Sequence, residues 1–226
     1  VVSIIATIIF IQMGKKNPNS FIDFKLFRNM TYTGATISNF LLNATAGILI
    51  IAMTLIQLGG DLTAQQAGLL TLGYAISIVA FIRVGEVLLR KFGPRKPMIW
   101  GALIVILSIF LLMPTHFYLD SYQWRVVVAF SLFGVGLAFY ATPSTDAALV
   151  SLPEDQIGSG SGIYKMASSL GASFGVAISA TVLTAFSANP ESIQWIEGVI
   201  SYIGRQDNVA IREAAFFAFG VNLIMA

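Results

Sequence analysis

The sequence predicts an all-α membrane protein, and two observations carry that prediction. The first is composition: the 226 residues are 56% hydrophobic and only 11% charged, whereas soluble domains contain roughly 25% charged residues. The second is the recurrence of long apolar segments, since about 20 apolar residues span a bilayer as one helix. Within hydrocarbon a helix satisfies its own backbone polar groups, so each long segment is expected to be helical.

Seven apolar segments follow one another along the chain. Five are long enough to span a bilayer, whereas the first begins inside an apolar run and the last lacks a polar flank. We therefore expect five complete and two partial transmembrane helices, in a chain that is part of a larger protein. The segments cover approximately 1–13, 30–58, 65–89, 97–114, 124–150, 158–187 and 212–226.

Lysine and arginine residues predict which side of the membrane each connection faces. Cytoplasmic connections carry an excess of these residues. The first connection holds Lys15, Lys16, Lys25 and Arg28, and the third holds Arg90, Lys91, Arg95 and Lys96, against Arg125, Arg205 and Arg212 on the opposite side. The first and third connections, and by alternation 151–160, are therefore predicted to be cytoplasmic.

Three units follow from this pattern: the end of a transmembrane helix at 1–13, a cytoplasmic linker at 14–29 and a C-terminal transmembrane bundle at 30–226. In the linker, apolar and charged residues alternate as in an amphipathic helix lying on the membrane surface. Within the bundle, isoleucines at helical spacing indicate a structured outer flap at 187–212, although a strand hairpin is an alternative.

Composition also argues against several functional classes. The formal net charge of +2 is too small to indicate nucleic-acid binding. Without cysteine, and with His116 as the one histidine, the chain has neither disulfides nor the ligands of a typical metal cluster. Motifs of hydrolases and nucleotide-binding enzymes are absent from the sequence, so a secondary transporter that uses no cofactor is favoured over an enzyme.

Ionisable residues within apolar segments mark candidate functional positions, because they are costly to bury in hydrocarbon. Arg83, Glu86 and Arg90 are spaced three and four residues apart, so they can share one helix face and neutralise one another. We interpret them as an ion-pair latch in preference to a ligand contact.

Asp146 is a second candidate, one turn after Thr142 in the segment FYATPSTDAAL. Pro143 removes a helix hydrogen bond, and Gly134 with Gly136 is expected to loosen the preceding turns, so the helix is predicted to kink there. Interrupted helices often line transport sites. A hydrated carboxylate at the helix end is an equally good interpretation.

Lys165 is the third candidate, in the otherwise uncharged stretch IYKMASSLGASFG. Gly171 and Gly175 form a GxxxG pattern that favours close helix packing, so this face is expected to contact protein. Lys165 could snorkel to the interface, pair with Asp146, or project into an aqueous vestibule.

Several stretches of the sequence resemble the Nor-type quinolone and multidrug efflux pumps, which are fourteen-helix drug:proton antiporters of the major facilitator superfamily. They are FIDFKLFRN, YTGATISNFLLN, RVGEVLLRKFGPRKP, GVGLAFYATPSTD and GIYKMASSLGASFGVAIS. The resemblance covers nearly the whole chain and places it between the eighth and fourteenth helices. It implies two helical bundles that rock about a central site in the bacterial cytoplasmic membrane, with the N-terminal half missing here.

The resemblance further implies export of hydrophobic and cationic drugs, driven by protons rather than by a cofactor. Its partners would be membrane lipid, small-molecule drugs, protons and the N-terminal half. The residues that it suggests for the cavity wall are Phe40, Phe139 and Tyr140, with Asp146 exchanging between proton and cationic drug. One motif departs from the superfamily: in GEVLLRKFGPRK, Arg90 replaces the expected aspartate ahead of Gly93, and Glu86 could supply the carboxylate.

Two alternative functions stay open at this point. One is a transporter of a specific metabolite or osmolyte with the same architecture, which would need several converging hydrogen-bond donors. The other is a membrane scaffold or sensor that transports nothing.

Overall fold

All regular structure in the described part of the chain is helical, as the sequence predicts. The computed structural model describes residues 24–116, 119–189, 191–192, 201–202 and 208–226. The predicted helix end at 1–13, most of the linker and most of the outer flap lie outside these ranges. The helices are η1 (Phe24–Arg28), α2 (Met30–Ala44), α3 (Gly47–Thr54), η2 (Leu55–Gly59), α4 (Ala64–Phe92), α5 (Arg95–Leu112), α6 (Leu119–Val150), η3 (Glu154–Gln156), α7 (Ile157–Ala188) and α8 (Val209–Met225).

Five stretches of helix in the described residues are long and apolar enough to cross a membrane. They are Met30–Gly59, Ala64–Phe92, Arg95–Leu112, Tyr122–Val150 and Glu154–Ala188. Their bounds agree with the five complete segments predicted from hydropathy. The chain is thus an all-α, multi-pass membrane protein.

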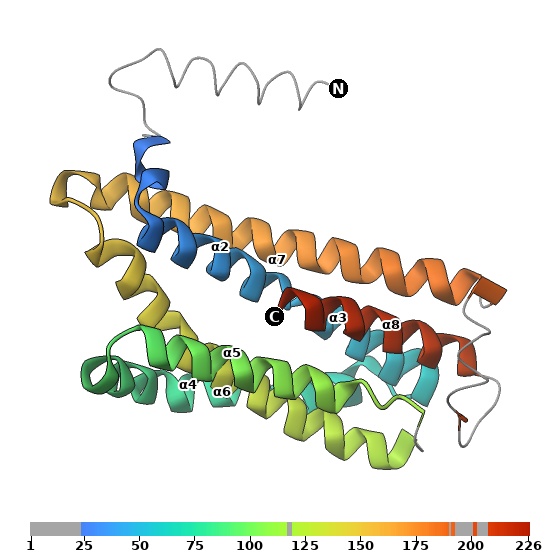
Figure 1. Cartoon of the computed structure of the whole chain (residues 1–226). Coiled ribbons are helices and arrows are strands. Elements are labelled where there is room, and N and C mark those ends of the chain that lie inside the picture. The colour runs from blue at the N-terminus through green and yellow to red at the C-terminus, as the bar shows by residue number, and fades with distance from the viewer. Residues whose placement is uncertain (1–23, 117–118, 190, 193–200, 203–207) are drawn as a thin grey trace, which may run out of the picture.

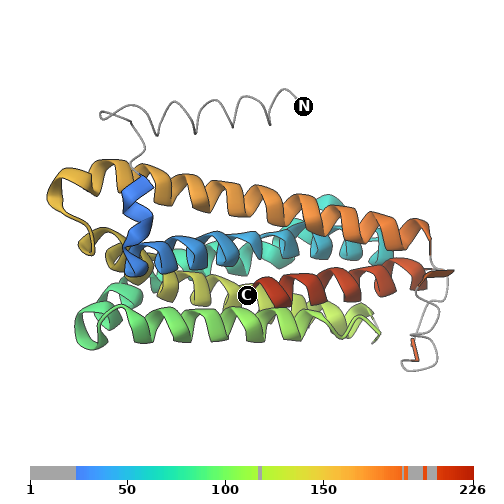
Figure 2. The same cartoon turned by 45° about the horizontal axis from the view of Figure 1, so that its top comes forward.

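The helices run side by side as a bundle of two groups (Figure 1). One group contains α4, α5 and α6, with α6 packed against both of its neighbours. The other contains α7 with α2, α3 and α8 along its length. A turned view keeps α7 and α5 on opposite sides of the bundle (Figure 2). Because α2 also contacts α6, the two groups join along the line where these helices meet.

Residues close to the helix ends stabilise them, in two cases by accepting hydrogen bonds from free backbone N–H groups. The Asn29 side chain accepts hydrogen bonds from the backbone N–H groups of Thr31 and Tyr32, which caps α2. Thr63 and Gln66 form a capping box at the start of α4. At the other end of α4, Gly93 has φ of +71°, a conformation that favours glycine.

The first membrane span is interrupted at a place that the sequence pattern does not reveal. Between α2 and α3 the backbone N–H of Thr45 bonds the carbonyl of Leu42 at 3.2 Å, and that of Ala46 bonds Asn43 at 3.0 Å. These are tight three-residue turns, and the Thr45 hydroxyl also donates to the Leu42 carbonyl at 2.6 Å. At Pro143, by contrast, α6 continues through the proline as one helix, and the kink predicted there stays a prediction.

Glycines bring several pairs of helices into close backbone contact. A Cβ at Gly171 or Gly175 would overlap the carbonyl oxygen of Phe40 or Ala44 on α2. This confirms the predicted GxxxG packing face of α7. Its helix partner is α2, followed by α3.

The interpretation of Gly134 and Gly136 as residues that loosen α6 needs correction. A Cβ at Gly134 would overlap the Tyr74 carbonyl of α4, and one at Gly136 would lie 2.7 Å from the Gly101 carbonyl of α5. Both glycines therefore serve close packing between helices, while α6 stays helical throughout.

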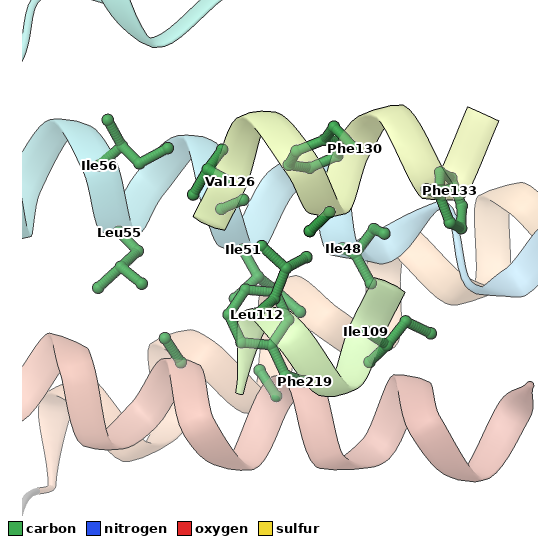
Figure 3. Close-up of a cluster of buried hydrophobic side chains, with 14 of the residues drawn as sticks. Ile48, Ile51, Leu55, Ile56, Ile109, Leu112, Val126, Phe130, Phe133 and Phe219 are labelled. Carbon is green, nitrogen blue, oxygen red and sulfur yellow. The ribbon is translucent and has the colours of Figure 1, made fainter. Parts of the chain in front are cut away.

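The main hydrophobic core occupies one end of the bundle. We call this end the outer half, since the charge pattern predicts that it faces away from the cytoplasm, and the other end the inner half. Figure 3 shows core side chains converging there, among them Ile48, Leu112, Phe130 and Phe219, all at most 2% exposed. They come from α3, α5, α6 and α8.

The inner half has a smaller core that ties three chain segments together. Tyr32 of α2 is fully buried and donates a hydrogen bond to the Gly160 carbonyl of α7 at 2.8 Å. The Asn29 amide donates to the Ser151 carbonyl, just beyond α6, at 2.6 Å. These long-range bonds hold the start of α2 against the connection from α6 to α7.

Candidate functional site

Two neighbouring hollows in the inner half contain Asp146 and Lys165, two of the ionisable residues selected from the sequence. The Asp146 hollow has a volume of about 440 Å³. It is lined by Leu89, Ala141, Thr142, Thr145, Asp146, Leu149 and Val150. Thr142 and Asp146 lie one turn apart on α6, as predicted, and Asp146 is half-buried.

The Lys165 hollow lies between α2, α4, α6 and α7 and has a volume of about 240 Å³. Lys165 shares it with polar side chains of α2, α6 and α7 and with isoleucines of α4. The lining residues are Asn39, Asn43, Ile78, Ile82, Leu137, Ala138, Tyr140, Ala141, Thr145, Tyr164, Lys165 and Ser168.

Lys165 and Asp146 do not pair with each other. Neither has a salt-bridge partner among the residues that the structure describes. Both hollows are nevertheless lined by Ala141 and Thr145, so the cation and the carboxylate face adjoining spaces across one turn of α6. Of the arrangements expected for Lys165, the pair with Asp146 is therefore excluded.

A hydrogen-bond network organises the wall of the Lys165 hollow. The amide of Asn43 donates to the side-chain oxygen of Asn39 at 2.9 Å, and the Asn39 amide donates to the Tyr164 carbonyl at 3.1 Å. The hydroxyls of Tyr164 and Ser144 are 2.7 Å apart, linking α7 to α6. Asn39 and Asn43 were not selected from the sequence, although amides at i and i+4 in an apolar span are a usable signal.

The three predicted aromatic residues occupy different surroundings. Tyr140 lines the Lys165 hollow, is 4% exposed and hydrogen-bonds Ser38 of α2. Phe40 instead packs against Phe174, with ring centroids 6.1 Å apart. Phe139 packs against a ring of α4. Only Tyr140 lines one of the two hollows.

A third hollow of about 580 Å³ lies between α2, α5 and α6. Tyr140 separates it from the Lys165 hollow, since this residue lines both. Its other lining residues are mainly apolar: Met30, Thr31, Gly34, Ala35, Ser38, Pro94, Arg95, Met98, Ile99, Ala102 and Ala147.

The predicted ion-pair latch is formed by two of its three charged members. Arg90 donates to the Glu86 carboxylate at 2.6 Å, and both side chains are exposed. Arg83 has no ion-pair partner among the described residues, which corrects the three-residue interpretation. The reason is geometric, because an acid four residues before a base is the favourable order on a helix.

A buried polar cluster in the outer half was missed in the sequence. Arg212 of α8 is 2% exposed; its Nε donates to the Thr115 carbonyl at 2.8 Å, and the Thr115 hydroxyl donates back to the Arg212 carbonyl at 2.8 Å. The Tyr202 ring lies 5.1 Å from the guanidinium carbon. The adjacent charged residues Arg212 and Glu213, at the start of the last apolar segment, were the sequence signal for this cluster.

Burial shifts the pKa values of Tyr202 and His116, two residues outside the membrane spans. It raises the pKa of Tyr202 to about 12, with a further contribution from the Glu213 carboxylate. Burial and the positive charges of Arg125 and Arg212 lower the pKa of His116. The phenol is therefore protonated and the imidazole neutral at neutral pH.

Comparison with known proteins agrees with the geometry. A family model described as Major Facilitator Superfamily matches residues 30–219. The chain is similar to the Quinolone resistance protein NorB of Staphylococcus aureus strain MRSA252, with 45% identity over 181 residues, which are 80% of this chain and 39% of that protein. For NorB of strain JH9 the identity is 46% over 174 residues, 77% of this chain and 38% of that protein. The chain spans about two fifths of the length of these curated relatives.

Proposed function

Because the chain belongs to the Major Facilitator Superfamily, we propose that it forms one wall of the drug cavity in a proton-coupled multidrug exporter of the bacterial cytoplasmic membrane. The rest of the cavity would come from the N-terminal half of the same protein. Its substrates would be hydrophobic and cationic drugs, such as dyes and quinolones.

The observation that carries this proposal is the unpaired carboxylate of Asp146 in a mostly apolar hollow. Leu89, Leu149 and Val150 provide nonspecific contact area, which suits substrates of varied shape. A carboxylate without a protein partner can hold either a proton or a cationic drug, and competition between the two is the simplest coupling of drug export to proton import.

The alternative of a specific metabolite transporter would need several fixed hydrogen-bond donors converging on one space. The Asp146 hollow has only the hydroxyls of Thr142 and Thr145 beside the carboxylate, and Thr145 donates to the Ala141 carbonyl within α6 at 2.9 Å. The Asp146 hollow therefore suits broad specificity, and the 45% identity to a quinolone resistance protein favours an exporter of drugs over a metabolite transporter.

The test is Asp146→Asn in the full-length protein, measured as drug efflux from cells. We expect export of a cationic dye to fall by about tenfold or more, because charge-assisted contacts are worth about 1.5–3 kcal/mol, while export of a neutral substrate changes little. Asp155→Asn, in the exposed turn after α6, is the matched control and should export both compounds normally. Equal loss of both substrates, or no loss of either, would contradict the role of Asp146.

A further inference from the structure

The ammonium group of Lys165 has no place in the cation exchange proposed for Asp146. It lies eight residues into α7, about 12 Å along the helix axis from its first residue. At that position Lys165 is exposed, and it lines a hollow bounded by four helices, apart from the basic rim at residues 90–96. The role of Lys165 therefore has to be inferred from the side chains around it.

Two hydrogen-bond donors of this hollow are uncommitted. Lys165 and Ser168 are one helical turn apart on α7, and neither side chain makes a hydrogen bond to the residues that the structure describes. Asn39 uses one amide hydrogen on the Tyr164 carbonyl and keeps a second. The described lining includes no acidic side chain, so an anion entering the hollow would meet donors and no repelling carboxylate.

The remaining walls are apolar or aromatic. Ile78 and Ile82 of α4 face Tyr140 and Tyr164, both of which are nearly buried. A flat ring could lie between them while a charged substituent reached Lys165. The volume of about 240 Å³ suits one end of a drug-sized molecule.

We propose that the Lys165 hollow binds the carboxylate of aromatic substrates, through the Lys165 ammonium and the Ser168 hydroxyl, with the Asn39 amide as a further donor. The proposal rests on the drug-export function and deepens it, because it assigns the residues that recognise the carboxylate of a substrate. Zwitterions are suited to both hollows, since the carboxylate of Asp146 lies across the shared residues Ala141 and Thr145.

The experiment compares a quinolone carboxylic acid with its methyl ester in proteoliposomes of the full-length protein. Vesicles of zwitterionic lipid are used, so that no anionic headgroup can occupy the site. We expect the unmodified protein to have about a tenfold lower KM for the acid than for the ester. Lys165→Gln should abolish this preference, Lys165→Arg should keep most of it, and both should export a cationic dye within about twofold of the unmodified protein.

Matched controls separate a local role from a general one. Lys96→Gln removes a lysine at the exposed inner rim, where its ammonium lies 5.7 Å from the Phe92 ring centroid, and should leave the preference for the acid unchanged. Ser168→Ala should raise the KM for the acid by less than Lys165→Gln does, because a neutral donor contributes less.

Three results would overturn the inference. A preference for the acid that survives Lys165→Gln would place carboxylate recognition elsewhere. Equal loss of acid and dye export in that variant would show a structural role for the lysine. Export of dye and ester by the unmodified protein without preference for the acid would refute this inference alone, whereas export of none of the three would refute the proposed function as well.

Discussion

Two groups of polar side chains, one in the outer half of the bundle and one in the inner half, differ in whether their members have a protein partner. In the outer half, Arg212 and Thr115 are buried to within 2% of full burial and satisfy each other's backbone groups. In the inner half, Lys165 and Asp146 line hollows and have no ion-pair partner among the described residues. Buried polar groups that are satisfied stabilise one arrangement, whereas unsatisfied groups next to a space are available to a ligand.

The difference also runs along a single helix. The half of α7 from Gly171 to Ser179 packs closely against α2 and α3, while the half before it lines the Lys165 hollow. Close backbone packing and the lining of the Lys165 hollow therefore lie at different positions along α7. Three predictions for the full-length protein follow, of which the first compares the two parts of α7 and the others compare sites elsewhere in the bundle.

The largest effect is expected for Gly175→Ala in the packed half of α7. Its new methyl group would overlap the carbonyl carbon and oxygen of Ala44, which are backbone atoms and cannot move aside without separating the helices. We expect a loss of about 3 kcal/mol or more in folding stability. The measurement is the thermal unfolding of the purified variant in detergent, together with its expression yield, each compared with the unmodified protein.

Gly162→Ala is the matched control for that prediction. Gly162 lies on the same helix, but nothing lies within 4 Å of a Cβ placed there. Alanine is also the better helix former, by about 1 kcal/mol. Gly162→Ala should therefore be neutral or slightly stabilising, and similar losses for both variants would remove the distinction between the halves of α7.

An intermediate effect is expected for Thr115→Val in the outer cluster. The change keeps the side-chain shape but removes the buried hydrogen bond from the Thr115 hydroxyl to the Arg212 carbonyl, at a cost of about 0.5–1.5 kcal/mol. Thr145→Val in the inner half breaks only a bond to the preceding turn of α6 and should cost less than about 0.5 kcal/mol. The measurement is the melting temperature of each variant. A larger loss for Thr145→Val than for Thr115→Val would contradict the expected difference between the two halves.

The smallest effect is expected for Glu86→Gln. Its ion pair with Arg90 is exposed and lies within one helix, so its contribution to stability is about 0.5 kcal/mol or less. The melting temperature should barely change. A marked drop in the melting temperature would mean that Glu86 contributes through contacts beyond this pair.

Hydropathy alone was enough to locate the membrane helices. The thickness of the bilayer sets the length of an apolar segment, and both length and composition are local properties of the sequence. The five complete spans were predicted this way, and the close-packing face at Gly171 and Gly175 was predicted from its GxxxG spacing. The interruption at Thr45 was not, since no proline marks it. It lies beside the point where the Ala44 carbonyl meets Gly175, a contact between residues far apart in the chain.

For the candidate site, the sequence identified the ionisable residues within apolar segments, namely Asp146, Lys165 and the Glu86–Arg90 pair. Whether such charges meet depends on helix rotation and packing, and the bundle places Asp146 and Lys165 in adjoining hollows instead of pairing them. It also brings Asn39 and Ser168 beside the lysine, and buries Arg212 against Thr115. Residue type and spacing thus define the spans and the charges within them, whereas contacts between helices decide which charges are satisfied and which face an open space.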